Sequence, residues 1–135
     1  MQSKIDRIII DTNLWISFLI TKDFTRLDKI IFSKKCTLVF SQELLNEFLE
    51  VVKRPKFRRF FTSTDIEDIL ETIDEYADFV EVKSTTKGCR DHKDNFLLSL
   101  SLDGNVDYLL TGDKDLLDLN KFKKTTIITI AEYLQ

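Results

Sequence analysis

Short apolar runs alternate along the chain with longer segments of helical periodicity. Runs this apolar leave no polar face for water, which is typical of parallel strands covered by helices on both sides. We therefore predict an α/β fold, a single domain with three α/β/α layers around a mostly parallel sheet of about five strands. The five runs that predict strands, each rich in β-branched or other apolar residues, are 7–10, 37–40, 79–82, 106–110 and 125–129.

The segments between these runs carry the clearest helical patterns. Residues 64–77 repeat apolar side chains every three to four positions, behind a capping-box signature formed by Thr64 and Glu67. Residues 42–53 and 91–103 also predict helices, and the glycine that follows the second of these segments suits a helix C-cap. Strands and helices thus alternate, as in a parallel sheet with crossover helices.

Length and composition fit one globular domain that spans residues 1–135. Apolar residues make up 43% of the chain and charged residues 32%, which excludes a disordered or fibrous protein. Cys36 and Cys89 match no zinc-binding spacing and no disulfide framework, so we expect reduced thiols. The charged N-terminus does not resemble a signal peptide, and no apolar run approaches the ~20 residues of a membrane span. We expect a cytoplasmic protein without a membrane segment.

Two acidic residues follow predicted strands directly. Asp11 comes after the run 7–10, and Asp113 follows the run 106–110 after a two-residue turn. Ligands of open parallel α/β sheets bind at the carboxyl ends of the strands. We therefore expect both carboxylates at the same edge of the sheet, although either could instead serve as a helix N-cap.

Two further acids belong to predicted helices. Glu47 lies just outside the apolar face of its helix, whereas Glu43 and Glu50 point to solvent. Asp94 lies within the inward-facing arc of its helix, where an unpaired carboxylate is costly. Taken singly, Glu47 could be a surface acid and Asp94 a first-turn residue stabilised by the helix dipole. Together, four acids at one edge favour a site for Mg²⁺ or Mn²⁺, which prefer oxygen ligands.

Four blocks of the chain occur in an order and at spacings that match a known family. The blocks are Ile-Ile-Ile-Asp-Thr-Asn at 8–13, Ser-Gln-Glu-Leu-Leu-Asn-Glu at 41–47, Arg-Asp-His-Lys-Asp-Asn at 90–95 and Thr-Gly-Asp-Lys-Asp-Leu-Leu at 111–117. They resemble the PIN-domain family, and most closely its small prokaryotic members that act as toxins of toxin–antitoxin pairs. The resemblance covers roughly residues 4–135. The chain departs from the family at His92, where related sequences often have proline, and we assign no catalytic role to that residue.

This resemblance implies a ribonuclease that depends on Mg²⁺ or Mn²⁺. The implied catalytic and metal-binding acids are Asp11, Glu47, Asp94 and Asp113, with Asp91 and Asp115 as further metal-binding candidates and Asn13 and Ser41 as residues that orient the site. The resemblance further implies an RNA substrate, a small antitoxin protein as partner, and a homodimer as a further expectation.

The segment 53–61 combines basic and aromatic residues and predicts an RNA contact. Basic groups there can pair with phosphates, and Phe57 or Phe60 can stack on a base. The alternative is a solvated helix end with core phenylalanines. The candidate basic residues are Lys53, Arg54, Lys56, Arg58 and Arg59.

Two other functions compete with the nuclease. One is a non-catalytic RNA- or protein-binding module that keeps the acids for structure or metal. The other is a phosphatase resembling the haloacid dehalogenases, but that family needs a second aspartate where this chain has Asn13. No inward-facing lysine is evident for a covalent aspartyl-phosphate, and the same absence weakens a receiver-domain interpretation.

Overall fold

The computed structural model describes residues 5–86 and 92–135. Within these ranges six strands form one sheet in the order β3-β2-β1-β4-β6-β5, and every neighbouring pair is parallel except β5 with β6. The predicted α/β class with a mostly parallel sheet is confirmed, and the two-residue β5 adds a sixth strand. The strands are β1 (Asp6–Ile10), β2 (Cys36–Phe40), β3 (Ala77–Phe79), β4 (Tyr108–Leu110), β5 (Lys121–Phe122) and β6 (Thr125–Ile128).

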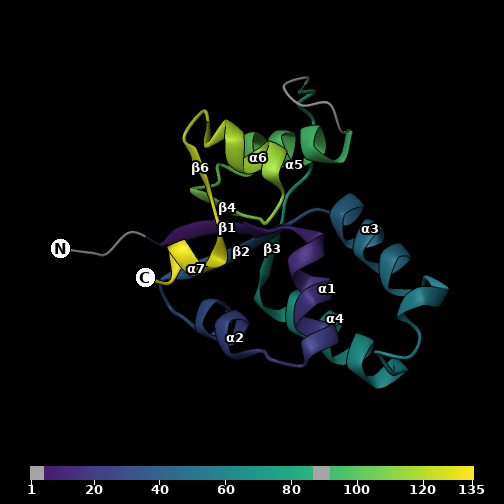
Figure 1. Ribbon diagram of the computed structural model, residues 1–135. Coiled ribbons are helices and arrows are strands. Elements are labelled where there is room, and N and C mark those ends of the chain that lie inside the picture. The colour runs from purple at the N-terminus through teal and green to yellow at the C-terminus, as the bar shows by residue number, and fades with distance from the viewer. Residues whose placement is uncertain (1–4, 87–91) are drawn as a thin grey trace.

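Helices cover both faces of this sheet (Figure 1). On one face lie α1, α2, α3 and α4, and on the other lie α5 and α6. None of the helices in the described ranges is long and apolar enough to cross a bilayer. The helices are α1 (Thr12–Thr21), α2 (Thr25–Ile31), α3 (Gln42–Val52), the 3₁₀ turn η1 (Pro55–Phe57), α4 (Ser63–Tyr76), α5 (His92–Asp103), α6 (Lys114–Leu119) and α7 (Ile130–Tyr133).

The central strands β1 and β4 are buried on both faces. Ile8, Ile9 and Leu109 are completely inaccessible to solvent, as the continuous apolar runs predict. On the face formed by α1 and α3, the Trp15 ring lies 5.8 Å from Phe40, between centroids, in a tilted aromatic contact. These contacts fix the carboxyl ends of the strands relative to the helices that follow them.

The third strand lies earlier in the chain than its sequence pattern indicates. The predicted run 79–82 is wrong, because β3 comprises Ala77–Phe79 and begins directly where α4 ends. Its partner β2 ends at Phe40, whose carbonyl accepts the backbone N–H of Val80 at 2.8 Å. The chain turns into α3 after Phe40, so later residues of the apolar run have no strand to pair with.

The capping box of α4 also lies two residues earlier than predicted. Thr62 accepts a hydrogen bond from the backbone N–H of Asp65 at 3.1 Å, and the Asp65 carboxylate accepts the N–H of Thr62 at 2.9 Å. The predicted pair, Thr64 with Glu67, is therefore wrong. Thr62 with Asp65 has the same spacing, and aspartate satisfies the same orphan N–H as glutamate does.

The order of the strands places a topological switch beside β1. The chain leaves β1 for β2 on one side, and returns from β3 to β4 on the other side. In open α/β sheets this switch opens a crevice at the carboxyl ends of the strands, where ligands bind. Asp11 and Thr111, the residues that follow β1 and β4, both lie there.

The C-terminal helix α7 reaches the amino ends of β1 and β2 through Tyr133. The hydroxyl of Tyr133 donates to Asp6 Oδ2 at 2.8 Å and lies 3.0 Å from the sulfur of Cys36. Burial is the main cause that raises the pKa of Tyr133, and the hydrogen bonds to Cys36 and Asp6 raise it further. This hydroxyl therefore stays protonated. Cys36 is a free thiol, as expected, and Cys89 lies outside the described residues. The C-terminal helix is thereby bonded to the first residues of β1 and β2.

Close packing, rather than the expected C-cap geometry, requires the glycine after α5. Gly104 follows the helix directly, but its φ is not positive, and the left-handed residue there is Asn105 with φ 56°. A Cβ at Gly104 would lie 2.9 Å from both the carbonyl oxygen of Leu100 and Cγ1 of Val39. The missing side chain thus lets α5 lie close against β2.

We therefore expect Gly104→Ala to lower the free energy of unfolding by about 1–3 kcal/mol, the usual cost of overpacking a core. Gly112→Ala is the matched control, because a Cβ at Gly112 would meet nothing within 4 Å. Urea unfolding followed by circular dichroism measures both variants. Equal stability of the two variants would contradict this explanation.

Candidate active site

One threonine hydroxyl links the two acids that follow the central strands. Thr111 Oγ1 donates to Asp11 Oδ2 at 2.8 Å, and it accepts the backbone N–H of Asp113 at 3.0 Å. Thr111 is buried, and its own N–H is bonded to the carbonyl of Ile128 in the neighbouring strand. Asp11 and Asp113 are thus held at one edge of the sheet. Sequence reasoning assigned no role to Thr111, although it follows β4 as Asp11 follows β1.

Neither acid acts as a side-chain helix cap. Asp11 and Asp113 occupy the N-cap positions of α1 and α6, but neither side chain makes a capping hydrogen bond. Ser41, by contrast, caps α3 by accepting the N–H of Leu44 at 3.1 Å. Oδ2 of Asp113 is buried and has no hydrogen-bond partner among the described residues, which is costly for a carboxylate oxygen. The N-cap alternative therefore accounts for the positions of these acids, but not for the hydrogen bond from Thr111 to Asp11 or for the buried Oδ2 of Asp113.

The environment of Asp11 opposes its ionisation. Burial raises the pKa of its carboxyl above the ordinary value of 3.8, and the negative charge of Asp113 raises it further. The hydrogen bond from Thr111 and the backbone N–H of Asn13 lower it in part. A carboxylate that burial and a like charge both destabilise gains free energy from a nearby cation.

The two helical acids lie where the helical periodicity predicts. Asp94, in the first turn of α5, faces inward and is 8% exposed. Glu47 on α3 is half-buried, whereas Glu43 and Glu50 are exposed. The carboxylate of Glu47 lies 3.5 Å from Nζ of Lys93 in an ion pair. Lys93 is a second residue at this edge for which the sequence analysis predicted no role.

All four principal acids line one pocket of about 180 Å³. They come from four places in the chain, at the ends of β1 and β4 and on α3 and α5. Asp115 is exposed on α6 and does not line the pocket, and Asp91 lies outside the described residues. The lining residues are Asp11, Thr12, Asn13, Glu47, Val51, Arg54, Lys56, Phe57, Lys93, Asp94, Leu97 and Asp113.

The two residues expected to orient the site differ in position. Asn13 is exposed and lines the pocket, and its backbone N–H acts on the carboxylate of Asp11. Ser41 is completely buried and does not line the pocket. Its cap on α3 orients the helix that carries Glu47, so its influence on the site is indirect.

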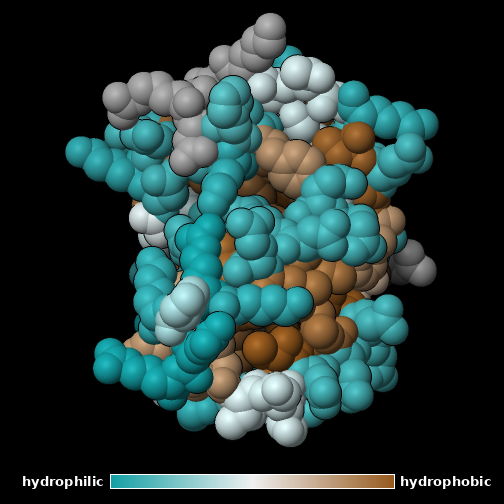
Figure 2. All heavy atoms as spheres, turned by 90° about the vertical axis from the view of Figure 1, so that its right-hand side faces the viewer, coloured by the Kyte–Doolittle hydropathy of each residue, from teal (hydrophilic) through white to brown (hydrophobic). Residues whose placement is uncertain are grey.

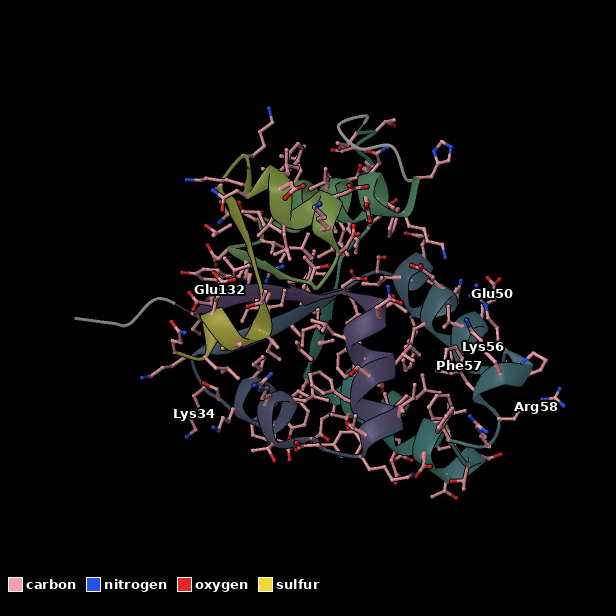
Figure 3. The ribbon with its side chains drawn as sticks, in the orientation of Figure 1. Lys34, Glu50, Lys56, Phe57, Arg58 and Glu132 are labelled. Atoms are coloured by element: carbon pink, nitrogen blue, oxygen red, sulfur yellow. The ribbon has the colours of Figure 1, made fainter. Side chains whose placement is uncertain are left out.

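The basic segment contributes only part of its predicted residues to the pocket. Arg54, Lys56 and Phe57 line it, whereas Lys53, Arg58 and Arg59 do not. Figure 3 shows Arg58 extending outward, away from the body of the molecule. This face carries a band of hydrophilic side chains with hydrophobic atoms visible beside it (Figure 2). Acidic and basic groups therefore share one cavity, with an aromatic ring at its wall.

The donor set suits a divalent cation with a preference for oxygen. Such an ion would provide a partner for Oδ2 of Asp113, which has none among the described residues, and would favour the ionised form of Asp11, whose pKa is raised. In residues 5–86 and 92–135, however, no three His, Cys, Asp or Glu side chains are close enough to hold one ion together. The acids therefore surround a shared cavity rather than form a closed coordination shell.

Comparison with known proteins identifies the family. The model of the PIN domain matches residues 7–115, which include all four acids of the pocket. The chain therefore belongs to the PIN-domain family, whose members are generally metal-dependent nucleases. Searches of curated proteins and of solved structures find no match.

We expect Asp11→Asn to raise the melting temperature of the metal-free protein at pH 7 and to abolish stabilisation by Mn²⁺. The raised pKa means that ionising Asp11 costs free energy in the folded state. In the metal-free protein, the contribution of Asp11 to the free energy of unfolding therefore falls as the pH rises from 3.8, the pKa of the unfolded chain, through the higher pKa of the folded protein. Stabilisation of the wild-type protein by Mn²⁺ should show the opposite dependence and disappear as the pH falls through that range, because protons compete for the carboxylate.

Differential scanning fluorimetry with and without Mn²⁺, between pH 4 and 8, measures both effects. Asp23→Asn is a control for which we expect the opposite change in melting temperature, because hydrogen bonds from Thr25 lower the pKa of Asp23. That exchange should lower the melting temperature at pH 7 and leave the response to Mn²⁺ intact. A less stable Asp11→Asn protein that still responds to Mn²⁺ would contradict the electrostatic account.

Proposed function

We propose that this protein is a ribonuclease that depends on Mg²⁺ or Mn²⁺ and hydrolyses RNA phosphodiester bonds. The observation that carries the proposal is one pocket lined by Asp11, Glu47, Asp94 and Asp113, in which Oδ2 of Asp113 is buried without a hydrogen-bond partner among the described residues. Membership of the PIN-domain family supports a nuclease in general. An acidic pocket with basic and aromatic walls favours a phosphate-containing polymer as substrate.

Each acid has a proposed role. Asp11, Asp94 and Asp113 would hold one cation between them, directly or through its bound water, and Glu47 would complete a second site with Asp91. A divalent cation held there would supply a water molecule of lowered pKa and would neutralise charge on the attacked phosphoryl group. Thr111 holds the Asp11 carboxylate in place through its 2.8 Å hydrogen bond. No side-chain nucleophile is needed for such a reaction.

The walls of the pocket supply contacts for the RNA chain. Arg54 and Lys56 can pair with phosphates on either side of the cut, and Phe57 can stack on a base. The Phe57 ring already stacks against Phe61, with centroids 5.9 Å apart, so its plane is held in the folded protein. Unpaired bases are needed for such stacking, which favours a single-stranded segment at the cut.

The biological role that we propose is the toxin of a toxin–antitoxin pair in the cytoplasm. A small antitoxin would then cover the acidic pocket, and the protein would act as a homodimer. These proposals rest on the resemblance of the four sequence blocks to toxin members of the family. A small protein that co-purifies with the chain and inhibits its nuclease activity would identify the partner directly.

Cleavage of a labelled single-stranded RNA, with Mn²⁺, Mg²⁺ or EDTA, tests the proposed activity. We expect cutting only with metal, and a loss of at least about 100-fold for Asp94→Ala and Asp11→Ala, because charge neutralisation supplies several kcal/mol to such reactions. Asp118→Ala is the matched control, since Asp118 is exposed on α6 and does not line the pocket.

Either of two results would refute the proposed activity. The first is full activity in both pocket variants. The second is an inactive wild-type protein that still binds RNA without metal, which would favour the non-catalytic binding module. Circular dichroism of each variant ensures that a lost activity is not a lost fold.

The position of the basic residues predicts unequal contributions to RNA binding. We expect the double variant Arg54→Ala/Lys56→Ala to raise KM for single-stranded RNA about tenfold or more, because both groups line the pocket. Arg58→Ala/Arg59→Ala removes the same charge from residues outside the pocket and should change KM less than threefold. Steady-state cleavage kinetics at fixed salt compares the two. Equal effects would show that only the overall charge of this face matters.

A further inference from the structure

The helix α4 is strongly acidic along its whole length. Every position three or four residues away from Glu71 holds another acid, and like charges at this spacing destabilise a helix. Among the residues that the structure describes, Asp65 is the one acid of α4 that forms an ion pair, with Lys22 at 3.2 Å. The acids of α4, which contains no basic residue, are Asp65, Glu67, Asp68, Glu71, Asp74 and Glu75. Their charge is therefore unfavourable within the chain and largely uncompensated there.

The opposite charge lies immediately before this helix. Positions 53–59 hold five basic residues and no acid, and α4 begins only four positions later, at Ser63. Arg58 and Arg59 are exposed, do not line the candidate active site, and form no ion pair with a residue in 5–86 or 92–135. Arg58 extends outward from the molecule (Figure 3). A basic surface and an acidic surface thus lie side by side.

An apolar groove of about 240 Å³ opens beside α4. Asp28, Asp65 and Asp68 line it together with six apolar side chains. Phe32, one of the six, is 60% exposed and contacts Tyr76 at the end of α4 edge-to-face, with ring centroids 5.4 Å apart. Exposed apolar groups bordered by polar ones are typical of surfaces that bind another protein. The apolar members are Leu19, Phe24, Leu27, Ile31, Phe32 and Ile69.

We infer that the basic segment of one copy docks on the acidic α4 of a second copy, and the reverse, in a twofold-symmetric dimer. Such a dimer needs a surface that is complementary to itself. Two adjacent patches of opposite charge meet this need, because a twofold rotation about an axis between them places each patch on its opposite. Arg58 and Arg59 then pair with the acids of the second copy's α4, beside the apolar groove.

A second copy suits this surface better than RNA does. An RNA chain on Arg58 and Arg59 would run directly beside the acids of α4, which repel phosphates. A second copy instead presents both charges in complementary order. Arg54 and Lys56, which line the pocket, stay available to the substrate in this dimer. The inference rests on the homodimer of the proposed function, to which it gives an interface.

Analytical ultracentrifugation over a range of protein concentrations, without metal or RNA, tests this interface. We expect a dimer whose Kd rises about tenfold or more in 1 M salt, where charges are screened beyond about 3 Å. Reversing either charge should weaken the dimer about 100-fold or more, because like charges then face each other in both contacts. The two reversals are Arg58→Glu/Arg59→Glu and Asp68→Lys/Glu71→Lys.

A mixture of the two reversed proteins gives the sharpest result. Each variant repels itself, but in the mixed pair both contacts again join opposite charges, so we expect a one-to-one heterodimer. Lys34→Glu/Lys35→Glu is the matched control, because it reverses two exposed lysines and Lys34 lies on the opposite side of the molecule from Arg58 (Figure 3). This control should dimerise as the wild-type protein does.

Three results would overturn the inference. They are a wild-type protein that is monomeric at every concentration, a dimer that both reversals leave intact, and two folded variants whose mixture stays monomeric. Circular dichroism checks the fold of each variant, and if the α4 variant does not fold, the salt series and Arg58→Glu/Arg59→Glu still decide. A dimer that passes these tests but cuts no RNA would refute the proposed nuclease and leave the interface standing.

Discussion

The pairing of β1 with β4 is the contact on which the rest of the molecule depends. It joins residues about one hundred positions apart, with Ile10 opposite Leu110, and it is sealed by side chains that water does not reach. This register brings Thr111 within 2.8 Å of the Asp11 carboxylate. Asp11 and Asp113 repel each other, but separating the buried strands beneath them would cost far more free energy than this repulsion. The pairing of β1 with β4 therefore keeps the two acids together.

Local sequence patterns correctly predicted the features that depend on a single helix or strand. The inward position of Asp94 and the boundary position of Glu47 follow from helical periodicity, and both are found in the structure. The bounds of β3 could not be predicted in this way, because they depend on where its partner β2 ends. The roles of Thr111 and Lys93 were equally inaccessible, since each depends on a contact between segments whose relative placement only the folded sheet determines.

Opposite charges in the pocket lower the electrostatic cost of placing four acids together. Burial and like charge make Asp11 difficult to ionise, while the ammonium group of Lys93 offsets the charge of Glu47 nearby. The negative charge of the acids is therefore poorly compensated at the strand ends and better compensated between α3 and α5. The fold places the electrostatic strain on the two strand-end acids, where a cation relieves it most.

The late position of β4 in the chain has a consequence for synthesis. The first strand and its acid emerge from the ribosome first, and β4, Thr111 and Asp113 follow about one hundred residues later. Because domains assemble as their segments become available, no nascent fragment that ends before residue 113 contains the complete set of acids. The pocket is therefore complete only after β4 has paired with β1, and whatever reaction it supports has to await the closure of the sheet.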